Sequence, residues 1–175
     1  MNRIILRVCA TEAHGLWSET ADLGLVFTVM TEALFPNDFR QIYNVADSCR
    51  LEFESLCQET ASIYTILFIS KVYFDLVSGY QERREQGGTV TYLAKSLRLL
   101  QNRLEDPIRA TDDSTISIIM SLARAATVAG DSASARVHMQ GLHKVLTLRG
   151  GIASLGDLHL QVKCLRLATY PSLEG

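Results

Sequence analysis

Apolar residues recur at intervals of three or four positions along most of this 175-residue chain, and no segment keeps the strict alternation of a half-buried strand. Residues 37–56 carry one such stripe, and residues 89–106 carry another. The first stripe consists of Phe39, Ile42, Val45, Cys49 and Phe53; the second consists of Val90, Leu93, Ala94, Leu97, Leu100 and Leu104. The chain is therefore predicted to be all-α: a single domain of six or seven helices, arranged as a bundle or an irregular array.

The middle of the chain is predicted to form two successive helices. The segment 59–78 is apolar on most sides, so its helix is expected at the centre of the fold, with Gly79 at its end. The polar stretch QERREQGG that follows is interpreted as a loop. Thr89 is then a candidate N-cap, and Pro107 stops the second helix because proline cannot continue it.

Polar residues mark the boundaries of two further helices. Asp112 or Asp113 is the predicted N-cap of the first, and Gly130 its predicted end. Its inward face is predicted to carry Ile116, Ile119, Met120 and Ala123. Asp131 or Ser132 then begins the next helix, which contains the segment ARVHMQGLHKVLTLRGG.

Two histidines in that segment, His138 and His143, raise the question of a metal or catalytic site. They are five residues apart, which turns their side chains about 140° away from each other on a helix. A helical metal pair needs a spacing of four. We therefore interpret them as ordinary helix residues, and predict a core-facing stripe on the same helix. The stripe consists of Ala135, Met139, Leu142 and Leu146.

The end of this helix has the pattern of a glycine cap. Arg149 lies in the last turn, where a cation suits the helix dipole, and Gly150 or Gly151 can adopt a positive φ. Ile152 is then expected to pack back on the helix. A functional alternative is that Arg149 binds an anion or a partner's carboxylate. Gly141, inside the helix, either admits a close neighbouring helix or is a tolerated weak point.

Composition argues against several classes of protein. The net charge is −2 and no basic stripe occurs, so direct binding to nucleic acid is not expected. The four cysteines form no C-x-x-C pair, which argues against zinc sites and favours reduced, buried thiols. The apolar run 63–77 is too short to span a bilayer. No nucleotide-binding or hydrolase motif is present, so we predict a non-enzyme with no catalytic, metal or cofactor-binding residues and no cofactor.

The segment ARVHMQGLHKVLTLRGGIASLG resembles part of the fungal-specific transcription factor domain, a family that often follows a binuclear zinc–cysteine module. The upstream segment from Tyr92 to Ala135 also resembles the family, with a helix ending in N-x-x-L, then D-x-T-I, then a G-D linker. The family-signature positions, with a structural role, are His138, Met139, Gly141, Leu142, Leu148, Arg149, Gly150, Gly151 and Gly156. The resemblance is clearest over residues 53–156.

This resemblance implies a helical regulatory domain over residues 16–175, after a poorly defined segment 1–15. Family members usually continue through further helices, so the domain is expected to be incomplete at its C-terminal end and to expose apolar surface. No zinc cluster is present, since six cysteines would be needed.

The resemblance also implies a role in nuclear transcriptional control. The domain would act through protein partners, such as the transcription machinery or a related factor, or through a small ligand lodged between helices. The alternative is a helical interaction or scaffold protein, no longer tied to transcription and found in the cytoplasm.

Overall fold

The computed structural model describes residues 59–77 and 86–169, and all regular structure within these ranges is helical. The elements are α4 (Thr60–Val77), α5 (Gln86–Glu105), α6 (Asp113–Val128), α7 (Ser132–Arg149), the 3-10 turn η1 (Ile152–Ser154) and α8 (Leu158–Thr169). The predicted all-α class is confirmed. The helix predicted over residues 37–56, the segment 1–15 and Gly79 lie outside the described residues.

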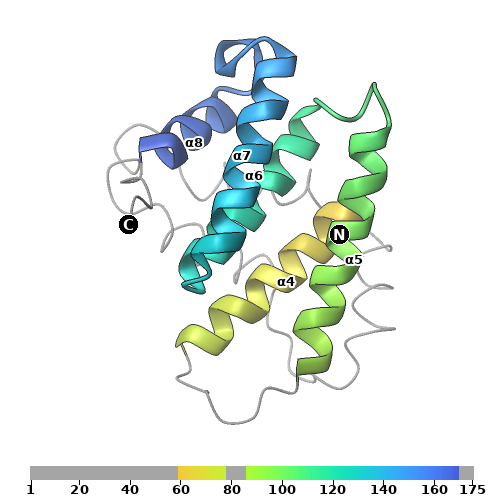
Figure 1. Ribbon diagram of the computed structural model, residues 1–175, viewed down its shortest axis with the longest axis vertical. Coiled ribbons are helices and arrows are strands. Elements are labelled where there is room, and N and C mark those ends of the chain that lie inside the picture. The colour runs from red at the N-terminus through yellow and green to blue at the C-terminus, as the bar shows by residue number, and fades with distance from the viewer. Residues whose placement is uncertain (1–58, 78–85, 170–175) are drawn as a thin grey trace.

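Helix α6 lies between its neighbours, with α7 packed along it and α4 and α8 against other parts of its surface (Figure 1). Ile116, Ile119, Met120 and Ala123 are all buried, as predicted for its inward face. Burial extends round the helix to Ile118, Leu122, Ala125 and Ala126, which no single stripe predicts. In α4, the side chains described over residues 60–72 are likewise buried on most sides, in agreement with the apolar sequence.

Helix α5 buries a different face from the predicted one. Of the predicted stripe only Leu100 is buried; Leu93 is half-buried, and the exposed members are Val90, Ala94, Leu97 and Leu104. The face that packs inward carries Tyr92, Ser96, Leu100 and Arg103. Polar anchors cause the difference. Ser96 shares a 2.5 Å hydrogen bond with Thr65 of α4, and Arg103 bonds to the start of α6, so these side chains turn inward.

Tyrosines complete the contact between α4 and α5. The Tyr64 and Tyr92 rings lie 6.4 Å apart between centroids, and Lys95 Nζ lies 4.8 Å from the centre of the Tyr64 ring. Such a cation over an aromatic face adds electrostatic attraction to the apolar packing. Because Tyr64 meets Tyr92 and Lys95, whereas Glu59 bonds to Arg103, α4 and α5 run antiparallel.

The helix boundaries mostly follow the predicted signals. Asp112 is the N-cap of α6, accepting a 2.7 Å bond from the Thr115 N–H, and Asp131 caps α7 through the Ser134 N–H at 3.0 Å. Gly130, with φ +74°, follows the end of α6.

The predicted start of α5 is wrong. The helix begins at Gln86 and includes both glycines of QERREQGG, so Thr89 is an internal residue rather than an N-cap. Its end at Glu105, just before Pro107, agrees with the prediction. None of the helices in the described ranges has the length and apolarity that a membrane crossing requires.

Candidate functional site

The signature segment forms helix α7 and the turn that follows it. The predicted core stripe is confirmed: Ala135, Leu142 and Leu146 are buried, and half-buried Met139 packs against the same core. Val145 is also buried and extends the stripe. The other signature positions lie outside this core, with Leu148 exposed on α7 and Gly156 exposed in the turn before α8.

A Schellman-type cap closes α7. Gly150 adopts φ +101° and donates its N–H to the Thr147 carbonyl at 3.1 Å, while Gly151 donates to the Leu146 carbonyl at 2.8 Å. Gly151 also has a positive φ, of +94°. Ile152 then packs against the core, as expected from the sequence. The glycine pair is therefore required by backbone conformation.

The two glycines of α7 are expected to respond to alanine with opposite signs. Gly150→Ala places a Cβ at φ +101° and should lower the free energy of unfolding by about 1 kcal/mol. Gly141→Ala adds a Cβ with nothing within 4 Å inside a regular helix, and should raise it by about 0.5–1 kcal/mol. Urea unfolding of both variants tests the pair. Destabilisation by Gly141→Ala would show that another helix approaches there.

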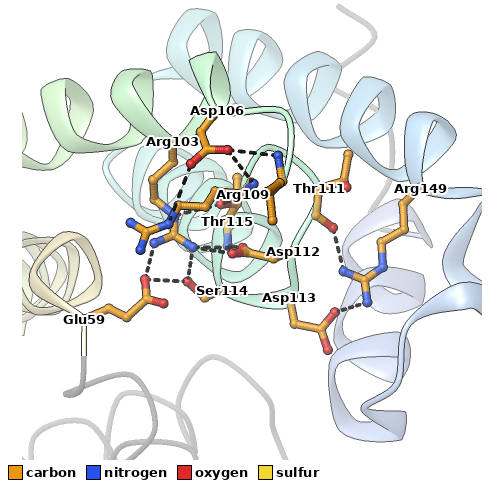
Figure 2. Close-up of polar contacts among 11 residues, drawn as sticks. Glu59, Arg103, Asp106, Arg109, Thr111, Asp112, Asp113, Ser114, Thr115 and Arg149 are labelled. Atoms are coloured by element: carbon orange, nitrogen blue, oxygen red, sulfur yellow. Dashed lines mark hydrogen bonds and ion pairs between the residues drawn. The ribbon is translucent and has the colours of Figure 1, made fainter.

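Arg149 reaches beyond its own helix to the start of α6. Its Nη1 donates to the Thr111 carbonyl at 2.5 Å, and its Nη2 lies 2.6 Å from Asp113 Oδ1 (Figure 2). The second contact is not aligned as a hydrogen bond and is best described as an ion pair. The interpretation of Arg149 as a local cap is therefore incomplete. Its carboxylate partner is within the chain and ties the end of α7 to the beginning of α6.

A second arginine, Arg103 of α5, also bonds to the start of α6. Its Nε donates to Thr115 Oγ1 at 2.8 Å, and its Nη2 donates to both Asp112 carboxylate oxygens at 2.9 and 2.7 Å. Nη2 also lies 2.8 Å from Ser114 Oγ, and Nη1 forms an ion pair with Glu59 Oε2. Figure 2 shows these groups converging from α4, α5 and α6. We call these five residues the arginine cluster.

The arginine cluster joins the helix ends rather than offering a reactive group. Ser114 donates to Glu59 at 2.8 Å, and Thr115 donates to the Arg109 carbonyl at 2.7 Å, so the hydroxyls are also engaged. One guanidinium supplies several fixed donors to two carboxylates, which is the geometry that arginine is suited to. Within the described ranges, no group of three or more His, Cys, Asp or Glu residues is placed to hold a metal ion.

The sequence pattern does not point to Arg103, because it predicts that α5 packs against the core through apolar side chains alone. The signal in the sequence is the pair Asp112–Asp113, for which the sequence pattern predicts only an N-cap. Asp112 does cap α6, but its carboxylate simultaneously accepts from Arg103, and Asp113 pairs with Arg149. An acidic pair at the start of a helix can therefore bind two arginines as well as cap the helix.

The histidines of α7, its N-cap Asp131 and the Cys164 thiol of α8 differ in burial, and burial or hydrogen bonding shifts the pKa of three of these groups. His143 is exposed, whereas His138 is half-buried and desolvation lowers its pKa, opposed by the charge of Asp131. The N–H that Ser134 donates lowers the pKa of Asp131. Cys164 is a free, buried thiol, as predicted, and burial raises its pKa to about 11. The other three cysteines lie outside the described residues.

His138 is expected to make the protein less stable in mild acid. Its pKa in the folded chain lies below the ordinary value of 6.5, so folding favours the neutral ring. This contribution is complete above the ordinary pKa and is lost as the pH falls through the folded value. Melting temperatures measured between about pH 7.5 and 5 should fall less steeply for His138→Gln than for the unchanged chain. His143→Gln, at the exposed histidine, serves as the control, and equal slopes for both variants would contradict the expectation.

Comparison with models of protein families matches residues 31–166 to the fungal specific transcription factor domain. The matched range contains α4 to α7, most of α8 and both the arginine cluster and the glycine cap. No match was found among curated proteins or among solved structures.

Proposed function

The chain belongs to the fungal specific transcription factor domain family, whose role is regulatory, and on that basis we propose that it takes part in transcriptional control by contacting other proteins. The partners we propose are components of the transcription machinery or a related factor, met in the nucleus. These 175 residues contain no C-x-x-C pair and carry a net charge of −2. We therefore propose that contact with DNA is made by residues outside these 175 or by a partner.

Exposed apolar side chains on α7 and α8 support the proposal that the chain acts by binding other proteins. Val137 and Leu148 are each more than half exposed and lie on one face of α7, since they are eleven residues apart. Leu158 and Leu165 are likewise more than half exposed and share a face of α8. Exposed apolar side chains on two helices are available for contact with another protein, which supports protein partners as the first proposal.

We also propose that the chain has no catalytic activity of its own. The family is generally non-catalytic. In the arginine cluster, the guanidinium, both carboxylates and both hydroxyls already bond to one another across helix ends. Groups held in this way position the helices and leave no activated nucleophile, which hydrolytic chemistry would need.

A reporter assay tests the proposal directly. The full chain is fused to an unrelated DNA-binding module and expressed with a reporter gene that this module recognises. We expect the fusion to change transcription relative to the module alone, and the double variant Val137→Lys, Leu148→Lys to lose the effect while keeping its melting temperature. Arg136→Gln, which leaves the apolar side chains in place, is the matched control on the same helix.

Chromatin association separates this proposal from the scaffold alternative. A tagged chain that is nuclear and co-purifies with chromatin supports a role in transcription. A chain that stays cytoplasmic, never co-purifies with chromatin and leaves the reporter unchanged would overturn the proposal in favour of an interaction protein no longer tied to transcription.

A further inference from the structure

The outer side of α7 presents four residues in one line. Val137 and Leu148 are 65% and 69% exposed and are separated by about three helical turns. Gly141 and Lys144 lie between them in the sequence and on the same side of the helix. This side is opposite to the core stripe of α7, which packs inward. We call these four residues the outer face of α7.

Lys144 places a positive charge between the two apolar side chains. It is exposed and forms no hydrogen bond or ion pair with another residue that the structure describes. Helix α7 contains no Asp or Glu. Its N-cap Asp131 lies about 20 Å along the helix from Lys144, and its carboxylate already accepts bonds from Ser134. The charge of Lys144 is therefore not balanced on its own helix.

Gly141 leaves room on the outer face beside Lys144. A Cβ built on this glycine meets nothing within 4 Å, so the surface there is open. A residue without a side chain lets the backbone of the helix be approached closely. A side chain of another protein can therefore lie over Gly141, between the two exposed apolar residues.

We propose that the outer face of α7 binds an acidic amphipathic segment of another protein. This inference rests on the proposed contact with other proteins and specifies the chemistry of the partner. The segment would pack apolar side chains on Val137 and Leu148 and place a carboxylate on Lys144. The apolar contacts would exclude water from the ion pair and so strengthen it. Complementary charge would also orient the segment and select against other partners.

A second copy of the chain is a poorer occupant of this face. Lys144 lies only about 2 Å along the helix axis from the midpoint between Val137 and Leu148. Two outer faces centred on each other about a twofold axis would therefore bring two lysines together. Like charges facing each other in an interface repel, whereas a carboxylate at the same place attracts.

Selection from a peptide library tests the proposal. Displayed peptides of about 18 residues, long enough to form a helix, are selected on the full chain. Peptides that also bind the double variant Val137→Gln, Leu148→Gln, which removes the apolar contacts without adding charge, are discarded. We expect the remaining peptides to carry an Asp or Glu between apolar residues at helical spacing. Remaining peptides without this enrichment, or none at all, would overturn the proposal.

Charge exchange then identifies the residue that binds the acid. Lys144→Glu should weaken binding of the selected peptides roughly tenfold, and changing the acidic residue of the peptide to Lys should restore it. Arg136→Glu makes the same change in charge about 80° round the helix from Lys144 and should weaken binding by no more than about threefold. Equal weakening by both variants would count against the proposal. Dimers of the chain that Val137→Gln, Leu148→Gln separates would assign the face to a second copy.

Gly141→Gln fills the open space with a polar, uncharged side chain. It should stabilise the helix, because glutamine has the higher helix propensity, and yet weaken peptide binding roughly fivefold. Opposite signs for stability and binding separate a blocked surface from an unfolded chain. Unchanged binding in this variant would contradict an approach of the partner over Gly141.

The peptide measurements and the reporter assay fail independently. Acidic peptides that bind as expected, with a reporter that stays unchanged, would support the outer face as a binding site and overturn only the role in transcription. A reporter effect that survives Lys144→Glu, with no acidic peptide selected, would overturn this inference and leave the role in transcription in place.

Discussion

Arg103→Ala should lower the free energy of unfolding by about 2–3 kcal/mol and the melting temperature by roughly 5–10 °C. The Arg103 side chain is only 7% exposed, and it is the group that joins Glu59, Asp112 and Thr115. Its removal leaves two neighbouring carboxylates without their cation and a buried hydroxyl without its donor. The carboxylates are 37% and 38% exposed, so water partly replaces the lost bonds, which keeps the loss below that of a fully buried pair. Thermal unfolding followed by circular dichroism measures the change.

Two further substitutions separate geometry from charge. Arg103→Lys keeps the positive charge but lacks the planar set of donors that reaches Thr115 and both Asp112 oxygens, so we expect about half of the loss. Arg109→Ala removes an exposed arginine whose Nε lies 3.9 Å from Asp106, and should change stability by no more than about 0.5 kcal/mol. If Arg103→Ala and Arg109→Ala behaved alike, the arginine cluster would not hold the helix ends together.

Local signals made the helices and their caps predictable. Asp112 and Asp131 each bond to a backbone N–H three residues ahead, and the glycine pair closes α7 through carbonyls of its own last turn. Such contacts lie within one turn of the chain, so the sequence pattern contains both partners. The core stripe of α7 was predictable for the same reason, since its period of 3.6 residues is a property of the helix itself.

The orientation of α5 and the arginine cluster were not predictable in this way. The bond between Ser96 and Thr65 spans 31 residues, and that between Arg103 and Glu59 spans 44. An apolar pattern ranks leucines above Ser96 and Arg103 as core residues, whereas the tertiary bonds turn these two polar side chains inward. The apolar side chains of Val90, Leu97 and Leu104 are then left on the outer side of α5.

Leu142→Ala is expected to have the largest effect of any substitution considered, lowering the free energy of unfolding by about 3 kcal/mol. Leu142 is 2% exposed and belongs to the main core cluster, where α7 packs against α6. Removing three methylene-sized groups loses their burial and leaves a cavity that rigid neighbouring helices cannot fill.

Leu148→Ala makes the same chemical change on the same helix at a residue that is 69% exposed. It should alter stability by no more than about 0.5 kcal/mol, so helix propensity cannot account for a difference between the two variants. Urea unfolding of both measures the difference directly, and a gap of less than about 1 kcal/mol would contradict the packing of α7 on α6. Because Leu142 and Leu148 both lie in the family signature, the comparison also distinguishes its two parts. A large loss of unfolding free energy in Leu142→Ala would show that this signature position stabilises the fold. Unchanged stability in Leu148→Ala would show that the fold does not require this exposed side chain, which is then available for contact with a partner.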